Sequence, residues 1–408
     1  MTATTATTVV TGLGIAAPNG LGTDDFWKAT LAGESGLAEL TRFDASQYPS
    51  GVAGEVPGYT AEEHIPSRLL PQTDHMTRLA LTAAEWAVED AGVRPDELPE
   101  YGMGVVTAAS GGAVEFGQRE LQNLWSQGKE YVSAYQSFAW FYAVNTGQIS
   151  IRHKMRGPSG VLLTEQAGGI DALGQARRHI RKGVPLVVSG GVDAALCPWG
   201  WVPQIASGLM STERNPARAY LPFAAAARGY VPGEGGAILV TEDAESARGR
   251  GAPRIYGEIA GYAATLDPGE DPGSCRLARA ARNALADARV APGEVDAVFA
   301  DASGVPALDR AEARALEEVF GPYGVPVTAP KSMTGRLLAG GAALDAATAL
   351  LSLRDGVIPP TANVTEADPE HRLDLVTGDP READLRTVLV LARGHGGFNA
   401  ALVLRRPA

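Results

Sequence analysis

Apolar residues along the chain occur in two patterns, short continuous runs and longer segments with helical spacing, and the two patterns alternate over most of the length. This alternation of strand-like and helix-like segments predicts an α/β fold. The segment 75–91 is the clearest helix, and Gly92 is placed to end it. Its apolar positions share one helix face, at Leu79, Ala83, Trp86, Ala87 and Ala91.

The order of these segments in the first part of the chain recurs in the second. In both parts a helix is followed by a strand and a turn of small residues, and later by a strand, a tight turn and a helix of small residues. The paired segments are 75–112 with 276–304, and 160–176 with 325–350. Similarity over this length predicts two structurally related halves rather than a solenoid. Chance likeness between two α/β segments is the alternative.

We expect the first half to span residues 1–245 and the second half to span residues 253–408. The stretch between them, 245–253, is rich in polar, small and turn-forming residues, which is typical of a boundary. Near the end of the chain, two β-rich runs flank a glycine-rich turn at 394–397. This pattern predicts a β-hairpin whose turn needs the conformational freedom of glycine.

Composition narrows the class of protein. The 408 residues are 45% hydrophobic and 20% charged, which suits a globular protein with more than one core. A net charge of −12 argues against nucleic acid or anionic membranes as partners. Two cysteines are too few for a disulfide framework. No stretch reaches the roughly 18 apolar residues of a membrane helix, and residues 1–12 lack the features of a secretion signal, so we expect a cytoplasmic protein.

One strand–turn–helix stands out where familiar catalytic motifs are absent from the sequence. Residues 12–18 begin like a dinucleotide-binding loop but lack its third glycine, and the six histidines have no metal-ligand spacing. The segment 161–173 places Gln166 at the first turn of a predicted helix, where backbone N–H groups would stabilise a thiolate. Glutamine cannot attack a thioester, so the residues alone favour a tight β–α connection.

Four motifs give the chain a specific resemblance. They are VVTGLGIAAPNG from Val9, YLPFAAAARGYVPGEGGAILVTED at 220–243, APKSMTGR at 329–336 and GHGGFNAALVL at 394–404. In this order they resemble the β-ketoacyl synthase family of the thiolase superfamily. TEQAGG at 164–169 and the aromatic stretch 137–153 resemble, more narrowly, the chain-length factors of type II aromatic polyketide synthases. The resemblance implies a thiolase-like fold, with two related halves in a five-layered α-β-α-β-α sandwich.

The resemblance also locates the catalytic positions of the family, and three of them carry other residues here. Gln166 stands where the family has its nucleophilic cysteine, and Asp301 and Arg336 stand where it has two histidines. Lys331 retains the lysine of the Lys-Ser-x-x-Gly motif, whereas Ala224 replaces the usual acid after Pro-Phe. We therefore expect no catalytic residue in the chain. We also expect Arg336 to form an ion pair with Asp301.

The function implied by the resemblance is that of a non-catalytic subunit. Such a subunit forms a heterodimer with a catalytic ketosynthase and shapes the tunnel for the growing poly-β-ketone, which sets its length. The substrate is then carried on the phosphopantetheine of an acyl carrier protein bound to the partner, and no metal or organic cofactor is expected. The runner-up is a malonyl-carrier-protein decarboxylase acting through Gln166, although the negative charge of Asp301 would oppose a developing enolate. A condensing enzyme using Cys197 or Cys275 is disfavoured, because neither lies at the turn of Gln166.

A crowded aromatic stretch is the candidate surface for the partner subunit. Six aromatic residues fall within 131–142, in a chain that is only 6% aromatic. Such density is typical of an interface core, and a helix buried in its own half is the alternative. We expect the interface to include Tyr135, Phe138, Trp140 and Phe141.

The preceding segment is the candidate tunnel wall. Ala109, Gly112 and Phe116 lie at i, i+3 and i+7, which on a helix is one face. We expect the small residues to leave volume for the polyketide and Phe116 to limit its length. On this hypothesis, Gly112→Phe shortens the product.

Overall fold

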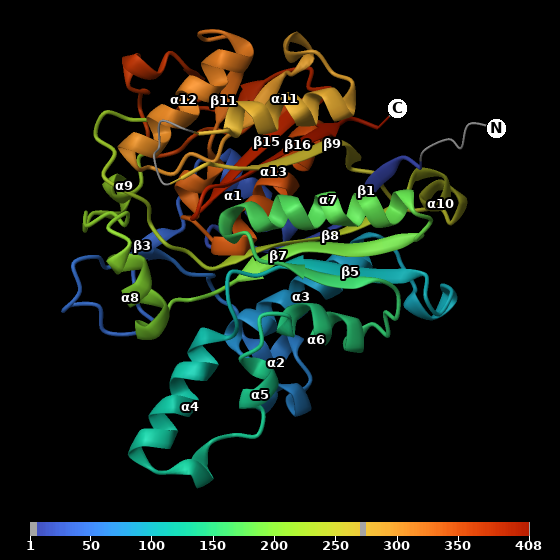
Figure 1. The fold of residues 1–408 in the computed structure, drawn as a ribbon, viewed down its shortest axis with the longest axis vertical. Helices are drawn as coiled ribbons and strands as arrows, with labels where there is room; N and C mark the ends of the chain where they lie inside the picture. Colours follow the sequence, from blue (N-terminus) through green and yellow to red (C-terminus); the bar gives the residue numbers. More distant parts are fainter. Residues whose placement is uncertain (1–5, 270–274, 408) are drawn as a thin grey trace.

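Five layers of helices and sheets form the molecule, shown by a computed structural model that describes residues 6–269 and 275–407 (Figure 1). Two sheets alternate with three layers of helices, so the predicted α-β-α-β-α sandwich is confirmed. The helix layers are, in order, α3 (His75–Asp90) with α6 (Val144–Arg152), α7 (Gly168–Arg181) with α13 (Gly341–Asp355), and α11 (Leu277–Ala288) with α12 (Pro306–Phe320).

The sheet of the first half has the strand order β6-β5-β7-β8-β1. Its members are β1 (Thr8–Ala17), β5 (Met103–Ala108), β6 (Ser159–Leu162), β7 (Leu186–Asp193) and β8 (Gly235–Asp243). β5 runs parallel to β6 and β7, and β8 runs antiparallel to β7 and β1. The inner strands are continuous buried runs because helices cover both faces of the sheet, whereas β6 lies at the edge and is partly exposed.

The sheet of the second half repeats this arrangement in the order β11-β10-β15-β16-β9, with β13 outside β11. Its members are β9 (Gly257–Leu266), β10 (Ala297–Phe299), β11 (Pro326–Thr328), β13 (Asp374–Leu375), β15 (Thr387–Gly394) and β16 (Phe398–Arg405). Pairing of Val9 and Val10 with Glu258 and Gly257 joins the two sheets. The matching strand orders confirm that the two parts of the chain are structurally related.

The middle layer contains helices that contact both sheets. α7 packs on β5 and β7 and also on β9 and β16, while α13 packs on β8 and β15. Every residue of α13 from Gly341 to Leu353 is buried, as expected for a helix that lies between two sheets. A Cβ on Gly169 would overlap the backbone nitrogen of Ala343, so the absence of a side chain lets α7 and α13 approach closely.

Several predicted elements are confirmed with small changes at their ends. The helix expected at 75–91 is α3, which ends before Gly92 (φ 61°), and the helix expected at 276–290 is α11. The predicted hairpin is β15 with β16, and Gly396 and Gly397 have φ of 88° and 89° in its turn.

The expected boundary stretch at 245–253 contains the end of a short helix followed by a turn. This helix, α10 (Ala244–Gly249), starts at Ala244 because the Asp243 carboxylate accepts the N–H groups of Glu245 and Ser246, both at 3.1 Å. Gly251 (φ 71°) follows the helix.

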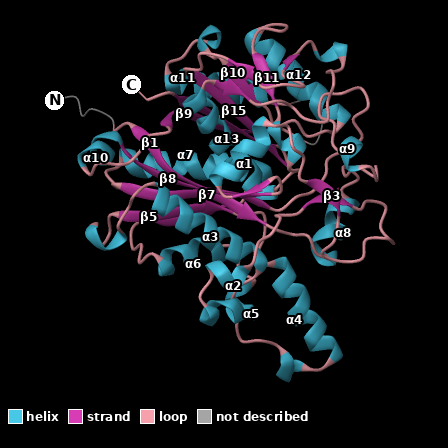
Figure 2. Ribbon diagram, turned by 180° about the vertical axis from the view of Figure 1, so that it is seen from behind, coloured by secondary structure: helices cyan, strands magenta, loops and turns pink. Residues whose placement is uncertain are grey.

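An arm projects from the first half beyond its outer helix layer (Figures 1 and 2). We define the arm as residues 114–143, which include α4 (Val114–Ser126), the 3-10 turn η3 (Lys129–Tyr131) and α5 (Gln136–Ala139). α4 begins at Val114, so Ala109 and Gly112 precede it. The prediction that these two residues share a helix face with Phe116 is therefore wrong.

The remaining elements are short or peripheral. The helices are α1 (Thr23–Leu31), α2 (Ala61–His64), α8 (Pro198–Ala206) and α9 (Pro216–Ala219), and the strands are β2 (Gly20–Leu21), β3 (Leu37–Glu39), β4 (Val52–Gly54), β12 (Val357–Ile358) and β14 (Arg381–Glu382). Within residues 6–269 and 275–407, no helix has the length and apolar character needed to cross a membrane.

Candidate functional site

The turn that carries Gln166 lies at the carboxyl ends of the parallel strands β5, β6 and β7. β6 ends at Leu162, the 3-10 turn η4 (Glu165–Ala167) follows, and α7 begins at Gly168. The strand–turn–helix predicted at 161–173 is thus confirmed. Gln166 is 6% exposed, and its side chain faces η8 (Leu338–Gly340) of the second half.

The amide of Gln166 is held by the main chain of Leu338. In the orientation that places donors against acceptors, the side-chain nitrogen donates to the carbonyl oxygen of Leu338 and the side-chain oxygen accepts from its N–H, each at 3.0 Å. Leu338 has a φ of 51°, a conformation uncommon for leucine. Gln166 therefore links the two halves through both of its polar groups.

Asp301 and Arg336 form the buried ion pair expected from the sequence. The guanidinium nitrogens of Arg336 lie 3.1 and 3.2 Å from the two carboxylate oxygens of Asp301. They also donate to the carbonyl oxygens of Asp301, at 3.2 Å, and Arg393, at 3.0 Å. Because the pair is bidentate and only 3% and 8% of its side chains are exposed, both charges are compensated inside the protein.

Electrostatics around this pair favour its charged form. Burial on its own would raise the pKa of Asp301, but the positive charges of Arg336 and Lys331 hold that pKa below its usual range. Burial would lower the pKa of Arg336, and the carboxylate of Asp301 keeps it well above its usual value. Behind the pair, Glu312 accepts the N–H groups of Asp301 and Ala302, both at 2.7 Å. Burial and the charge of Asp301 raise the pKa of Glu312 to about 7.

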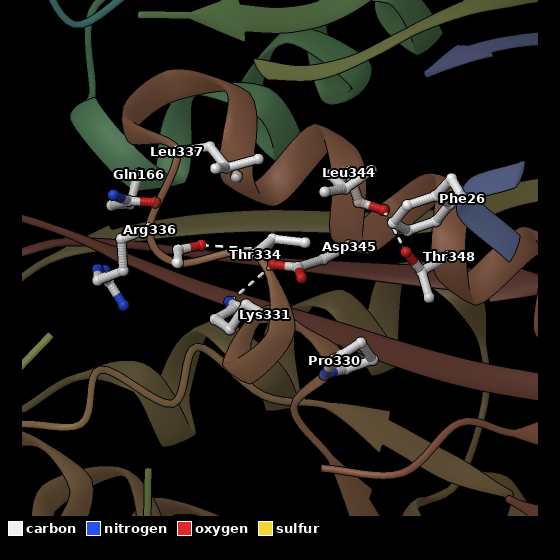
Figure 3. A pocket seen from close by; sticks show the side chains of 12 residues that line it. Phe26, Gln166, Pro330, Lys331, Thr334, Arg336, Leu337, Leu344, Asp345 and Thr348 are labelled. Carbon is white, nitrogen blue, oxygen red and sulfur yellow. Dashed lines mark hydrogen bonds and ion pairs between the residues drawn. The ribbon is translucent and has the colours of Figure 1, made fainter. Parts of the chain in front are cut away.

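A second ion pair, between Lys331 and Asp345, lies near Arg336 (Figure 3). The ammonium of Lys331 is 2.7 Å from Asp345 of α13, and both side chains are buried. The cavity bordered by Gln166, Lys331, Arg336 and Asp345 has a volume of about 10 Å³, enough for about one water molecule. A malonyl thioester therefore has no space between these side chains.

Glu165 is a site residue that the sequence pattern did not reveal. Its carboxylate accepts the N–H of His395 at 2.9 Å, which ties the glycine-rich turn of the hairpin to the turn of Gln166. Burial raises the pKa of Glu165, and Arg336 opposes this shift. Glu165 has a φ of 52°, so the backbone is unusual at this point. The sequence showed only that an acidic residue stands directly beside Gln166. It could not show that this carboxylate accepts a hydrogen bond from His395, which lies 230 residues away.

The side chains assembled here have no nucleophile and no free general base for acyl transfer. Arg336 is fully engaged with Asp301, and glutamine cannot form a thioester. Cys197 and Cys275 lie outside this cluster, and burial raises the pKa of each thiol, which disfavours the nucleophilic thiolate. Among the described residues, no group of histidine, cysteine, aspartate and glutamate side chains has the geometry of a metal site.

The candidate tunnel residues have different surroundings. Ala109 is buried, and its N–H donates to the carbonyl oxygen of Leu162 at 3.0 Å. A Cβ on Gly112 would overlap the carbonyl oxygen of Trp140, so Gly112 faces the arm's return segment rather than open space. Phe116 is 1% exposed in the core at the base of the arm. Ala109, Gly112 and Phe116 therefore do not lie on one helix face, and their role in a tunnel stays a prediction.

The arm exposes most of the aromatic residues that were predicted to form the interface. Tyr135, Trp140 and Phe141 are 40%, 49% and 48% exposed, so the alternative of a helix buried in its own half is wrong for them. The side chain of Phe138 lies outside the described part of the structure. The arm exposes further large apolar side chains, namely Leu124, Trp125, Tyr131 and Tyr142.

Gly117 and Trp199 are further residues of interest that the sequence pattern did not indicate. Trp199 of α8 stacks on Trp140 with ring centroids 5.4 Å apart and an angle of 22° between the rings. A Cβ on Gly117 would lie 2.9 Å from the Trp199 ring and 3.1 Å from the Trp140 ring. The tryptophan pair therefore sits directly over Gly117.

Comparison with protein families assigns the scaffold. The family described as "Beta-ketoacyl synthase, N-terminal domain" matches residues 6–246, and "Beta-ketoacyl synthase, C-terminal domain" matches residues 256–365. The chain belongs to the β-ketoacyl synthase family. In this β-ketoacyl synthase scaffold, the site of Gln166, Asp301 and Arg336 lies where the two matched regions meet.

Relatives named as polyketide ketosynthase components are more similar to this chain than a relative named as a 3-oxoacyl-[acyl-carrier-protein] synthase. The "Actinorhodin polyketide putative beta-ketoacyl synthase 2" of Streptomyces coelicolor is 61% identical. The "Tetracenomycin polyketide synthase ketoacyl synthase beta subunit" of Streptomyces glaucescens is 62% identical, and each match covers 98% of both chains. The "3-oxoacyl-[acyl-carrier-protein] synthase 2" of Coxiella burnetii is 33% identical over 98% of both chains.

Solved β-ketoacyl synthase structures show the same thiolase-like fold. A chain of "The ishigamide ketosynthase/chain length factor" is 30% identical, with a TM-score of 0.91 over 99% of this chain and 100% of that chain. A chain from a type II polyketide synthase acyl-carrier protein in complex with its ketosynthase bound to the hexaketide is 28% identical. Its TM-score is 0.88 over 98% of this chain and 100% of that chain.

Proposed function

We propose that this chain is the non-catalytic, chain-length-determining subunit of a ketosynthase heterodimer in a type II polyketide synthase. The observation that carries the proposal is the buried Asp301–Arg336 ion pair, at two positions where the family resemblance implies histidines. Enolate stabilisation requires donors aimed at the reacting oxygen. The guanidinium nitrogens of Arg336, however, already donate to the carboxylate of Asp301 and to the carbonyl oxygen of Arg393. The names of the relatives, ketosynthase beta subunits among them, support the same function.

The partner in this proposal is a catalytic ketosynthase subunit. The exposed aromatic side chains of the arm support a large protein interface, since a monomer rarely leaves so many large apolar residues uncovered. The edge strand β6 supports it too, because an unpaired strand edge is a site for pairing with another chain. The acyl carrier protein delivers the phosphopantetheine-bound substrate to the catalytic partner in this arrangement.

The tunnel wall in this proposal is a face of α4 different from the one expected from the sequence. With the helix starting at Val114, the positions i, i+3 and i+7 are Val114, Gly117 and Leu121, which are buried or half-buried. At Gly117 this face lies beside the Trp140–Trp199 stack. Because Gly117 has no side chain, the two rings can pack closely against the backbone of α4. Bulk at Gly117 therefore controls how much room the arm leaves for a chain.

The test of the function is reconstitution with a ketosynthase encoded beside this chain. The two chains are expected to co-purify, and together with malonyl-loaded acyl carrier protein they should produce a polyketide of one main length. The catalytic subunit with a relative of this chain, such as the tetracenomycin beta subunit, is the comparison. A product length that does not change when this chain replaces the relative would contradict the proposal.

The decarboxylase alternative predicts that the chain alone releases carbon dioxide from malonyl-loaded carrier protein. The cavity of about 10 Å³ beside Gln166 speaks against it. So does the pairing of Arg336 with Asp301, which occupies the cation that could otherwise stabilise an enolate. Carbon dioxide release by the purified chain that is lost in Gln166→Ala would establish the alternative.

A further inference from the structure

α8 begins without a cap of its own. Its N-cap residue Cys197 makes no side-chain cap hydrogen bond, and Pro198 at the first position has no N–H. The N–H of Trp199 is therefore the first donor of the helix that needs an outside acceptor. The side-chain oxygen of Gln118, on α4, accepts it at 2.7 Å. A side chain of one helix thus caps the other.

Trp199 is the residue whose position this cap determines. Its ring stacks on Trp140, and both rings lie over Gly117. Gly117 and Gln118 are adjacent on α4, so one turn of that helix supplies both the space for the rings and the anchor of Trp199. Two carboxylates fix the backbone of the arm. Asp74 accepts the N–H of Phe116 at 3.0 Å, and Glu120 accepts the N–H of Ser133 at 2.7 Å. Gln118 connects α4 to α8 through its hydrogen bond with Trp199.

We infer that Gln118 is a positioning residue for product length. By accepting the N–H of Trp199, it fixes the start of α8 and holds the Trp199 ring against Trp140, and so sets the bulk beside the Val114–Gly117–Leu121 face. The inference rests on the proposed function, because it requires this face to line the tunnel. Without this acceptor, Trp199 loses its 2.7 Å hydrogen bond to α4, and the start of α8 is less firmly fixed.

The experiment compares three variants in the reconstituted ketosynthase pair. Gln118→Leu keeps the size of the side chain and removes the acceptor, whereas Gln118→Glu keeps an acceptor oxygen. Gln122→Leu is the matched control, since Gln122 is an exposed glutamine one turn further along α4. Each pair receives malonyl-loaded acyl carrier protein, and the lengths of the products are measured by mass spectrometry. Near-ultraviolet circular dichroism of the variant chain reports the tryptophan stack.

Gln118→Leu is expected to lower the ratio of the main product to other lengths by about fivefold, the factor that corresponds to loss of a helix cap worth about 1 kcal/mol. It should also weaken the tryptophan circular dichroism signal. Gln118→Glu and Gln122→Leu should keep both. Gln118→Asn, which is polar but too short to reach, should behave like Gln118→Leu and replaces it where the leucine variant is insoluble.

An assembled Gln118→Leu pair with the wild-type product distribution overturns the inference, whatever the circular dichroism shows. Equal changes in Gln118→Leu and Gln122→Leu overturn it as well, because they would reflect a general effect on α4. Failure of the proposed function has a different signature. In that case the wild-type chain does not pair with the ketosynthase, or its exchange for a relative leaves product length unchanged.

Discussion

Arg336 shows how a single buried residue can depend on its hydrogen-bond partners. Its guanidinium binds the carboxylate and the carbonyl oxygen of Asp301 and the carbonyl oxygen of Arg393. A buried charge is tolerated only when it is paired and hydrogen-bonded. Arg336 and Asp301 therefore depend on each other. Replacement of only one of them leaves an uncompensated charge in the interior.

Arg336→Ala is expected to lower the free energy of unfolding by about 3 to 5 kcal/mol, because Asp301 loses its partner while buried. The control is Arg386→Ala, which removes an exposed partner of Asp384 and should cost no more than about 1 kcal/mol. Urea denaturation measures both. A double variant, Asp301→Leu with Arg336→Met, should be less destabilised than Arg336→Ala. The opposite order would show that the pair itself stabilises the fold.

Glu312 predicts how stability depends on pH. Its folded-state pKa is raised to about 7, from an ordinary 4.5, so the folded protein holds this proton more tightly than the unfolded chain does. The contribution of Glu312 to the free energy of unfolding is therefore fully present below about pH 4.5 and is lost as the pH rises to about 7. Urea midpoints across this window should fall more steeply in the wild type than in Glu312→Gln. Parallel curves would contradict the assignment.

Motif resemblance singled out Gln166, Asp301 and Arg336, but it could not supply all of their partners. The Asp301–Arg336 pair was predictable because opposite charges replace two residues that act together in the family. The bonds from Gln166 to Leu338 and from Glu165 to His395 were not, since both use backbone groups of distant segments. Backbone donors carry no signature in the sequence.

At the scale of elements, the close crossing of α7 and α13 depends on Gly169. Gly169→Ala is expected to destabilise the protein by about 1 to 3 kcal/mol, because the added methyl group overlaps the backbone of Ala343. Gly147→Ala in α6 is the control, since a Cβ there meets nothing within 4 Å. That variant should stabilise the protein by about 0.5 to 1 kcal/mol through helix propensity. Thermal unfolding should show a lower melting temperature for Gly169→Ala and a higher one for Gly147→Ala than for the wild type.

Gly117 predicts the effect of bulk on the product. Gly117→Leu places a side chain where a Cβ alone is already within 3.1 Å of two tryptophan rings, so the rings must move toward the proposed tunnel. We expect the reconstituted pair to make a polyketide shorter by at least one ketide unit, measured by mass spectrometry. Gly111→Leu is the control, because a Cβ at Gly111 meets nothing within 4 Å. Equal product lengths for the two variants would remove this face of α4 from the tunnel.

The start of α4 was mispredicted because tertiary hydrogen bonds determine it. Ala109 donates its N–H to Leu162, and Ser110 binds Asp193 and Ala339, which fixes both residues beside the strand ends. A helix from 109 would have to break these bonds. Hydrophobic spacing alone showed that a helix was present, but it could not show where the helix began.

At the scale of the molecule, the arm is a surface on which several large apolar side chains are exposed. Phe141→Glu with Tyr142→Glu is expected to weaken binding of the ketosynthase subunit by about 2 kcal/mol or more, because charges would have to be buried in an aromatic interface. Tyr323→Glu, at an exposed tyrosine of the second half, is the control. Quantitative co-purification of each variant with the partner measures the effect. Equal recovery in all cases would place the interface elsewhere.

The repeated architecture was readable from the sequence because each half carries the same order of apolar segments. The division into residues 1–245 and 253–408 stays a prediction. The joining of the sheets through Val9 and Val10 of β1 was not readable, since it depends on pairing between distant edges. The sequence showed that aromatic residues are concentrated in the arm, but it did not show that the arm projects from the first half.

The burial of α13 on all sides has a consequence for how the chain folds during synthesis. α7 and β8 are made first, and the apolar surfaces that they present to the middle layer remain uncovered until residues 341–355 leave the ribosome. The first half must therefore wait, partly exposed, while residues 244–355, roughly a quarter of the chain, are synthesised. A chain truncated before α13 is expected to aggregate, and holdase chaperones should bind the nascent chain until that helix arrives.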